Sequence, residues 1–291
     1  MQDYFEKQSD FIASSSDYQK ANTVLVGIPM DFTVSYRPGT RSGPQHIRFV
    51  SHGLEEYSFY TKRDLRDYDF FDAGDISLPL GNVPKSLEII EKVCQQIIND
   101  NKFAIYLGGE HLVSWPLIKI YSERYPGLAV LHFDAHADLR EDYLGETNSH
   151  ATVMRKVCEK IGGKNVYQFG IRSGDKSEYE YAQINTNMFI NKILEPLKKT
   201  IEVLQDRPVY ITLDIDVVDP AFAPGTGTPE PGGCTSSEII EAILLMNKLN
   251  VVGMDIVEVS PLNDPSDRTA ILAAKLVREA ILNYTKPRNG L

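Results

Sequence analysis

The feature that most constrains the fold is a series of short apolar runs along the chain. Most are continuously apolar and lack the alternation of a strand with one wet face. They therefore suit strands that are covered on both faces in a parallel sheet. The runs are TVLVGI (23–28), YDFFDAG (68–74), FAIYLGG (103–109), LAVLHFD (128–134), NVYQFGI (165–171), NMFI (187–190), PVYITLDID (208–216) and VVGMDIVEV (251–259).

Helix-like segments lie between these runs, at 86–100, 114–125, 236–249 and 268–284. Ser114 is expected to cap the second, with Pro116 in its first turn, and Ser236 or Ser237 to cap the third. Alternating strands and helices predict an α/β fold. Since no linker, repeat or low-complexity tract interrupts the pattern, we expect residues 1–291 to form one domain. Its architecture should be a three-layer αβα sandwich around a mainly parallel sheet.

Charge and composition narrow the classes of partner. The formal net charge is −10, which argues against a nucleic-acid surface and favours a small cationic substrate. The start MQDYFEKQSDF does not resemble a signal peptide, and no apolar run is long enough to cross a membrane. We therefore expect a cytoplasmic protein. The cysteines Cys94, Cys158 and Cys234 stand far apart and indicate neither disulfides nor a zinc site.

Acids and imidazoles collect where the predicted strands end. In open α/β sheets, ligands bind outside the carboxyl ends of the strands, so these side chains are expected to meet at one edge. They are His111 after 103–109, Asp134, His136 and Asp138 after 128–133, Asp214 and Asp216 at the end of 208–216, and Glu258 near the end of 251–259.

Each of these signals has a plainer interpretation when taken alone. A histidine after a Gly-Gly turn, such as His111, is more often a surface or capping residue. The segment LDIDVVDP could form a turn, but it lacks the glycine of an EF-hand loop. Asp214 and Asp216 are two positions apart, so on an extended chain they share a face, where two buried carboxylates repel. A bound cation would remove that repulsion.

Together, the six predicted ligands offer four carboxylates and two imidazoles without a thiolate. Two divalent ions would cancel the four negative charges, and the oxygen-rich set favours manganese over zinc, iron or cobalt. Paired divalent ions in proteins commonly activate a shared water for hydrolysis. The residues thus indicate a dinuclear metal hydrolase.

The motifs resemble those of the ureohydrolases, the family of arginases and agmatinases. The resemblance spans nearly the whole chain and is greatest to the bacterial agmatinases. It rests on GIPMDFTVSYRPGTRSGPQHIR (27–48), GGEHLVSWP (108–116), HFDAHADLR (132–140), SHATVMRK (149–156), LDIDVVDPAFAPGTGTPEPGG (213–233) and DIVEVSP (255–261).

This resemblance implies an arginase-like fold and a role for each site residue. One Mn²⁺ would be bound by His111, Asp134, Asp138 and Asp214, and the other by Asp134, His136, Asp214 and Asp216, so that Asp134 and Asp214 bridge. Glu258 would hold the substrate guanidinium, and His150 would shuttle protons. For His150 the plainer alternative is a loop histidine, and for Glu258 an exposed acid.

The implied reaction is attack of a metal-bridging hydroxide on a guanidinium carbon, with Asp138 passing a proton to the leaving amine. A homo-oligomer, either a trimer or a hexamer, is also implied. The alternatives are a hydrolase of arginine, guanidinobutyrate or formimidoylglutamate on the same site, or a noncatalytic metal-binding relative. The glycine-rich stretch 223–233 could suggest nucleotide binding, but it lacks the P-loop ending and is expected to form a rigid loop that walls the site. The stretch 37–44 has the same ambiguity, and the resemblance favours a loop near the mouth of the active site.

The segment 139–149 is expected to contact the far end of the substrate. Its acids Glu141, Asp142 and Glu146 favour a cationic tail, although Arg140 could pair with a carboxylate or with one of these acids. The segment also departs from the Ser-, Thr- and Asn-rich loop typical of arginases. Agmatine, hydrolysed to putrescine and urea, is therefore the predicted substrate.

Overall fold

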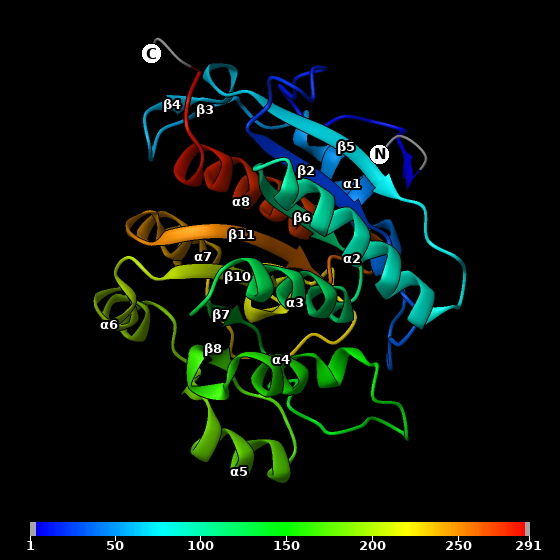
Figure 1. The fold of residues 1–291 in the computed structure, drawn as a ribbon, viewed down its shortest axis with the longest axis vertical. Coiled ribbons are helices and arrows are strands. Elements are labelled where there is room, and N and C mark those ends of the chain that lie inside the picture. Colours follow the sequence, from blue (N-terminus) through cyan, green and yellow to red (C-terminus); the bar gives the residue numbers. More distant parts are fainter. Residues whose placement is uncertain (1–3, 289–291) are drawn as a thin grey trace.

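A nine-stranded sheet runs through the centre of the computed structural model, which describes residues 4–288 (Figure 1). The strand order is β1-β5-β2-β6-β11-β10-β7-β8-β9, and every neighbouring pair is parallel except β1 and β5. These strands are β1 (Phe5–Glu6), β2 (Thr23–Ile28), β5 (Phe70–Ile76), β6 (Phe103–Gly108), β7 (Ala129–Phe133), β8 (Val166–Ile171), β9 (Asn187–Ile190), β10 (Pro208–Asp214) and β11 (Asn250–Val257). A separate antiparallel hairpin joins β3 (Tyr57–Ser58) to β4 (Arg63–Asp64).

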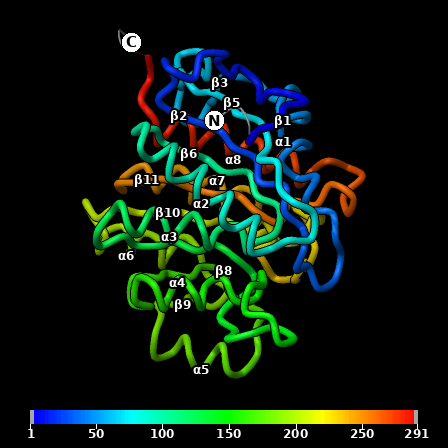
Figure 2. The backbone as a smooth tube through the Cα atoms, turned by 45° about the vertical axis from the view of Figure 1, so that its right-hand side comes forward, coloured from blue at the N-terminus to red at the C-terminus, as the bar shows by residue number. Residues whose placement is uncertain are grey.

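Helices cover both faces of this sheet and enclose two apolar cores. One core contains side chains from α1 (Gly43–Ser51), α6 (Leu194–Leu204), α7 (Ser236–Leu245) and α8 (Arg268–Tyr284). The other contains side chains from α2 (Val83–Asn99), α3 (Ser114–Arg124), α4 (Val153–Ile161) and α5 (Lys176–Asn185). In Figure 2, α5 lies at the end of the molecule remote from both termini. The predicted three-layer α/β architecture with a mainly parallel sheet is confirmed.

The four strands that carry the predicted site residues are neighbours in the middle of the sheet, in the order β6-β11-β10-β7. Asp214 pairs with Val257, and Leu213 pairs with Phe133, so three of these strands end at nearly the same level. Because they are parallel, their carboxyl ends open on one edge. Within residues 4–288, no helix is both long and apolar enough to span a bilayer.

The predicted helix starts need correction in three places. Ser114 is the first residue of α3 and not its cap, because a short 3₁₀ helix from His111 to Val113 runs directly into it. The cap of α7 is Thr235, whose side chain accepts from the Glu238 amide in a capping box, and not Ser236 or Ser237.

α2 begins at Val83, before the predicted start at 86, because Asn82 caps it and Pro84 occupies its first turn.

The ends of two site strands also differ from the sequence prediction. β10 stops at Asp214, and Ile215–Val217 form a 3₁₀ helix, so Asp214 and Asp216 do not share one extended strand. β7 stops at Phe133, and the residues after it are irregular. The sequence analysis did not name the helices α1, α4, α5 and α6, which have 9, 9, 10 and 11 residues.

Candidate metal centre and active-site pocket

The structure brings all six predicted ligands together at the carboxyl edge of the central strands. His111 begins the 3₁₀ helix after β6, Asp134 follows β7, and Asp214 ends β10. His111, Asp134 and Asp214 are almost completely buried, with 1%, 0% and 3% of their surface exposed. Each is delivered by a different strand end, so the sheet itself sets their spacing.

The six side chains form two groups that share Asp134. In the first group, His111 Nδ1 lies 3.0 Å from Asp134 Oδ2, 3.2 Å from Asp138 Oδ2 and 3.4 Å from Asp214 Oδ2. In the second group, His136 Nδ1 lies 3.0 Å from Asp216 Oδ2 and 3.5 Å from Asp134 Oδ1. Asp134 therefore presents one carboxylate oxygen to each group. This is the arrangement of a carboxylate that could bridge two ions.

Asp214 is placed less symmetrically than Asp134. Its Oδ2 faces His111, while its Oδ1 accepts a hydrogen bond from the Asp216 backbone N–H at 2.8 Å. In this structure Asp214 thus belongs to the first group only. The bridging role that the resemblance implies for Asp214 stays a prediction.

The environment of His111 indicates that a cation fits the first group. Thr212 Oγ1 donates to Asp255 Oδ1 at 2.7 Å, so it accepts from the His111 Nε2–H that lies 3.0 Å away. In the neutral ring, Nδ1 then carries a lone pair, which faces three carboxylate oxygens and has no hydrogen-bond partner. Only acceptors surround this buried atom. A divalent ion would satisfy all of them at once.

The pKa values show how strongly the carboxylates compete for positive charge. Burial raises the pKa of Asp138, and repulsion from Asp134 adds to it, bringing it to about 7. Burial likewise raises the pKa of Asp214 well above its usual value, and Asp216 and Asp134 add to the rise. Burial alone would lower the pKa of His136, but Asp216 and Asp134 raise it to about 12. The carboxylates of the cluster outnumber its cationic groups, so a bound cation would balance their charge.

Two acids of the site sit in the left-handed backbone region that side chains rarely adopt. Asp138 has a φ of 53° and Glu258 a φ of 64°. The Asp138 carbonyl accepts hydrogen bonds from the Met154 and Arg155 amides at the start of α4. The Glu258 amide donates to the Gly109 carbonyl at 2.8 Å. These bonds hold both residues in a conformation that aims their side chains at the site.

His150 reaches the site from a 3₁₀ helix, His150–Thr152, which Ser149 caps. Its backbone N–H donates to Thr33 Oγ1 at 3.1 Å, and Thr33 in turn donates its hydroxyl to the buried carboxylate of Glu110 at 2.5 Å. The Tyr143 ring meets the His150 ring edge to face, with 5.8 Å between the centroids. Burial lowers the pKa of His150 to about 4. The ring is therefore neutral near pH 7.

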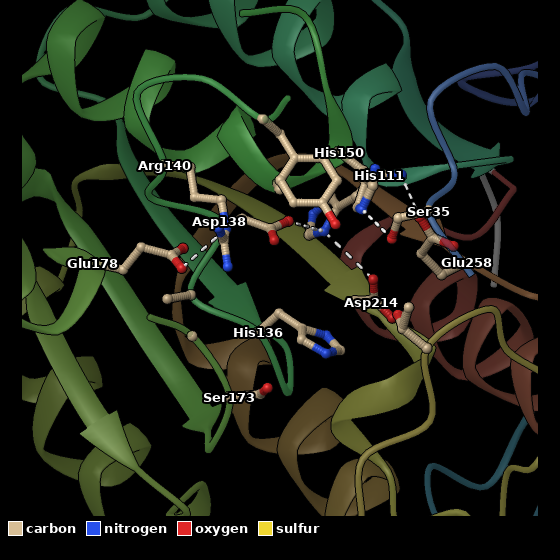
Figure 3. Close-up of a pocket in the computed structure, with 15 residues that line it drawn as sticks. Ser35, His111, His136, Asp138, Arg140, His150, Ser173, Glu178, Asp214 and Glu258 are labelled. Atoms are coloured by element: carbon tan, nitrogen blue, oxygen red, sulfur yellow. Dashed lines mark hydrogen bonds and ion pairs between the residues drawn. The ribbon is translucent and has the colours of Figure 1, made fainter. Parts of the chain in front are cut away.

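These groups surround one pocket of about 240 Å³ (Figure 3). Of the predicted residues, His111, His136, Asp138, His150, Asp214 and Glu258 line it, whereas Asp134 and Asp216 are not among the lining residues. Glu258 and Glu178 lie on opposite sides of the pocket (Figure 3). Among the described lining residues, Arg140 is the one Lys or Arg, and it pairs with Asp175 at 3.1 Å and Glu178 at 3.4 Å.

The three acids of segment 139–149 lie outside the site pocket. Glu141 pairs with Arg155 at 2.8 Å, and Asp142 accepts from the Gly145 amide within a turn. Glu146 lines a neighbouring groove. None of the three is among the residues that line the site pocket. From segment 139–149, Arg140 and Tyr143 line the pocket instead.

Of the two glycine-rich stretches, 223–233 contributes a residue to the lining of the site pocket and 37–44 does not. Thr228, within 223–233, lines the pocket. The 37–44 stretch runs into α1 and lies against the residues after Glu258, where a side chain at Gly43 would clash with the Val259 carbonyl.

Several neighbours of the site escaped the sequence analysis, chiefly His132, Gln168, Glu110, Thr33 and Glu178. His132 and Gln168 are polar residues inside otherwise apolar runs, which is a signal that could have found them. Glu110 is fully buried beside His111. No local pattern marks Thr33, which acts through a contact with a distant segment. Glu178 does belong to a local pattern, because it closes the capping box that Asp175 begins at the start of α5.

Comparison with known proteins agrees with this geometry. Residues 21–283 match the model of the arginase family. The chain is 53% identical to an agmatinase of Bacillus anthracis over 279 residues, which cover 95% of this chain and 96% of the relative. It is 54% identical to an agmatinase of Bacillus subtilis over 280 residues, again 95% and 96% of the two chains. A candidate agmatinase from Clostridium difficile has a solved structure with a TM-score of 0.89 and 39% identity, covering 92% of this chain and 98% of that one.

Proposed function

The chain belongs to the arginase family as an agmatinase-like ureohydrolase, and on this premise we propose that it hydrolyses agmatine to putrescine and urea. The observation that carries the proposal is the Asp134 carboxylate, which offers one oxygen to His111 and the other to His136, two residues that line the same pocket as Glu258. Such a set suits two divalent ions beside a bound guanidinium group.

We propose Mn²⁺ for both ions, because imidazole and carboxylate ligands without thiolate favour it. His111, Asp134, Asp138 and Asp214 would hold one ion, and Asp134, His136, Asp214 and Asp216 would hold the other. When bound, paired ions of this kind lower the pKa of a water they share, and so supply hydroxide as the nucleophile near neutral pH.

Three side chains of the pocket would bind the substrate and transfer protons. Glu258 accepts hydrogen bonds from the guanidinium group and fixes its plane, so that its carbon faces the ligand cluster. After attack, Asp138 accepts the proton that remains on the attacking oxygen and delivers it to the departing nitrogen, as the C–N bond to the butylamine breaks and urea forms. His150 is neutral near pH 7 and half-buried beside Ser35, and it exchanges protons between the pocket and solvent.

The far wall of the pocket supports a substrate with a cationic tail. Arg140 is already paired with Asp175 and Glu178, so this wall offers no free cation to a substrate carboxylate. The three side chains together carry one net negative charge. A tail ending in an ammonium, as in agmatine, is therefore favoured over the carboxylate of guanidinobutyrate or the amino-acid end of arginine.

The test is urea release from agmatine, arginine and guanidinobutyrate by protein that is stripped of metal and reloaded with Mn²⁺. We expect release to depend on Mn²⁺ and to be fastest with agmatine. Ammonia and formamide release from formimidoylglutamate is measured in parallel. Preference for another substrate would overturn the choice of agmatine, and no turnover of any would favour a noncatalytic metal-binding relative.

We further propose that residues 1–291 act as one ureohydrolase domain in a cytoplasmic homo-oligomer, a trimer or hexamer, without nucleic acid or membrane as partner. The family match over 21–283 supports the single domain. The oligomer rests on resemblance, and light scattering tests it.

A further inference from the structure

We infer that His132 is a positioning residue, which orients the shared Asp134 carboxylate by donating a hydrogen bond to it and does not itself bind metal. His132 lies on β7 with its side chain fully buried, and its Nε2 is 2.8 Å from Asp134 Oδ2. By distance alone it also groups with His111, Asp134 and Asp138 as a possible ligand. The inference rests on the proposed metal site but not on the proposed substrate.

The neighbouring strand decides which nitrogen of His132 carries the proton. Gln168 on β8 is the pairing partner of His132 in the sheet. Gln168 Nε2 lies 2.9 Å from the Ala137 carbonyl and 3.1 Å from His132 Nδ1. A backbone carbonyl only accepts hydrogen bonds, so the Gln168 atom facing it must be the amide NH₂. That NH₂ group then donates to His132 Nδ1 as well.

This assignment leaves His132 one role. Because Nδ1 accepts a hydrogen bond, it carries no proton, and the ring proton sits on Nε2, facing Asp134. Nε2 has no lone pair for a metal, and the lone pair of Nδ1 is occupied by Gln168. His132 is therefore a donor to Asp134 and cannot join the ligand set without breaking two buried hydrogen bonds.

The amide of Gln168 is itself held in place. Its Oε1 lies 3.1 Å from the Thr186 hydroxyl, which donates to it. Gln168, His132 and Asp134 are fully buried, and Thr186 is 6% exposed. A chain of hydrogen bonds thus runs from Thr186, at the end of α5, to the carboxylate at the centre of the site.

With this series of hydrogen bonds, each oxygen of the Asp134 carboxylate has one protein donor. Oδ2 accepts from His132, and Oδ1 accepts from the His136 backbone N–H at 2.6 Å. Each oxygen keeps one further lone pair, and these face His111 and His136. With one protein donor fixing each oxygen, the carboxylate is prepared to bridge. Outer partners of this kind typically change metal affinity by roughly 10- to 100-fold when removed.

The experiment measures Mn²⁺ affinity and stoichiometry by competition with a chelating dye, together with the melting temperature of metal-free protein. His132→Leu removes the donor, whereas His132→Gln places an amide N–H near the position of Nε2 and serves as the rescue variant. Gln168→Leu and Thr186→Val remove the supports one and two steps away. Tyr106 lies on β6, and Tyr106→Phe is the matched control, because it removes a buried hydrogen bond to Cys94 on α2, away from the ligands.

We expect His132→Leu to weaken Mn²⁺ binding by roughly 10- to 100-fold. His132→Gln should stay within a few-fold of wild type, and Gln168→Leu should fall between them. Thr186→Val should have a smaller effect in the same direction, and Tyr106→Phe none. Metal-free Gln168→Leu and Tyr106→Phe should melt at similar temperatures, which separates the metal effect from a general loss of stability. If His132→Leu does not fold, the ordering of Gln168→Leu, Thr186→Val and Tyr106→Phe decides.

Two results would overturn this inference while leaving the proposed metal site intact. One is wild-type affinity in both His132→Leu and Gln168→Leu. The other is loss of a whole ion in His132→Leu and His132→Gln with no change in Gln168→Leu, which would make His132 a ligand. A wild-type protein that binds no Mn²⁺ would instead overturn the proposed metal site and this inference with it.

Discussion

The Glu258 carboxylate accepts a hydrogen bond from the His111 backbone N–H at 2.8 Å, and the two residues follow the neighbouring strands β11 and β6. The candidate guanidinium-binding acid is thereby fixed against a candidate metal ligand. A second bond, from the Glu258 amide to the Gly109 carbonyl, doubles the connection. Gly109 is required here because a Cβ at this position would lie 1.9 Å from the Met30 carbonyl oxygen.

We predict that Glu258→Gln lowers kcat/KM for agmatine by roughly 10- to 100-fold, the value of one charge-assisted hydrogen bond. The amide oxygen still accepts from the His111 N–H, so the metal content should not change. Steady-state kinetics and metal analysis of the same preparation test this. Metal loss in Glu258→Gln would show that the acid supports the cluster and does not act on the substrate.

We predict opposite outcomes for His150→Ala and Asp134→Ala. His150 is outside both ligand groups, so its removal should slow turnover by roughly 100-fold or more while metal stays bound. Asp134 belongs to both groups, so its removal should release metal. Metal analysis beside initial rates distinguishes the two, and equal metal loss in both variants would contradict the assigned roles.

The contact between Thr33 and His150 predicts an effect on turnover from outside the pocket lining. Thr33→Val removes the hydroxyl that accepts the His150 amide and donates to Glu110. We expect kcat to fall about 10-fold with little change in KM, and the free energy of unfolding to fall by about 1–3 kcal/mol because Glu110 loses a donor.

Thr33→Ser keeps the hydroxyl and is the control. Kinetics and urea denaturation of both variants measure these effects. A change in KM alone would show that Thr33 shapes the pocket and does not position His150.

The low pKa of His150 predicts a pH-dependent difference in stability. Burial lowers it from 6.5 to about 4, so below pH 6.5 the unfolded chain takes up a proton that the folded chain refuses. Stability should therefore fall as the pH drops from 6.5 towards 4. Asn does not titrate, so His150→Asn lacks this pH-dependent loss. Between pH 7.5 and pH 5, the free energy of unfolding of His150→Asn should therefore rise relative to that of wild type by at most about 2 kcal/mol.

Denaturant unfolding of metal-free wild type and His150→Asn at the two pH values measures the difference. A difference between the two proteins that does not depend on pH would mean that His150 titrates normally in the folded state.

The sequence was most informative where chemistry and periodicity coincide. The continuous apolar runs predicted a parallel sheet because strands covered on both faces exclude polar side chains, and the runs at 23–28 and 187–190 match β2 and β9 residue for residue. Helix caps were less predictable. Thr235 and Ser236 offer the same hydroxyl one residue apart, and only the path of the chain from β10 decides which of them caps α7.

For the site, the residue types and their spacing identified a cluster of acids and imidazoles, because such groups are costly to bury without a cation. Only the tertiary structure decided how these acids and imidazoles are arranged into two groups. The Asp134 carboxylate lies between His111 and His136, and the Asp216 amide in the 3₁₀ helix after β10 donates to one oxygen of Asp214. Likewise, the pairing of β7 with β8 decides which ring nitrogen of His132 carries the proton. The charge of Arg140 is neutralised by Asp175 and Glu178, two residues from a distant segment. A linear pattern specifies which groups a chain carries, whereas their charges, tautomers and partners depend on distances between segments that are remote in the sequence.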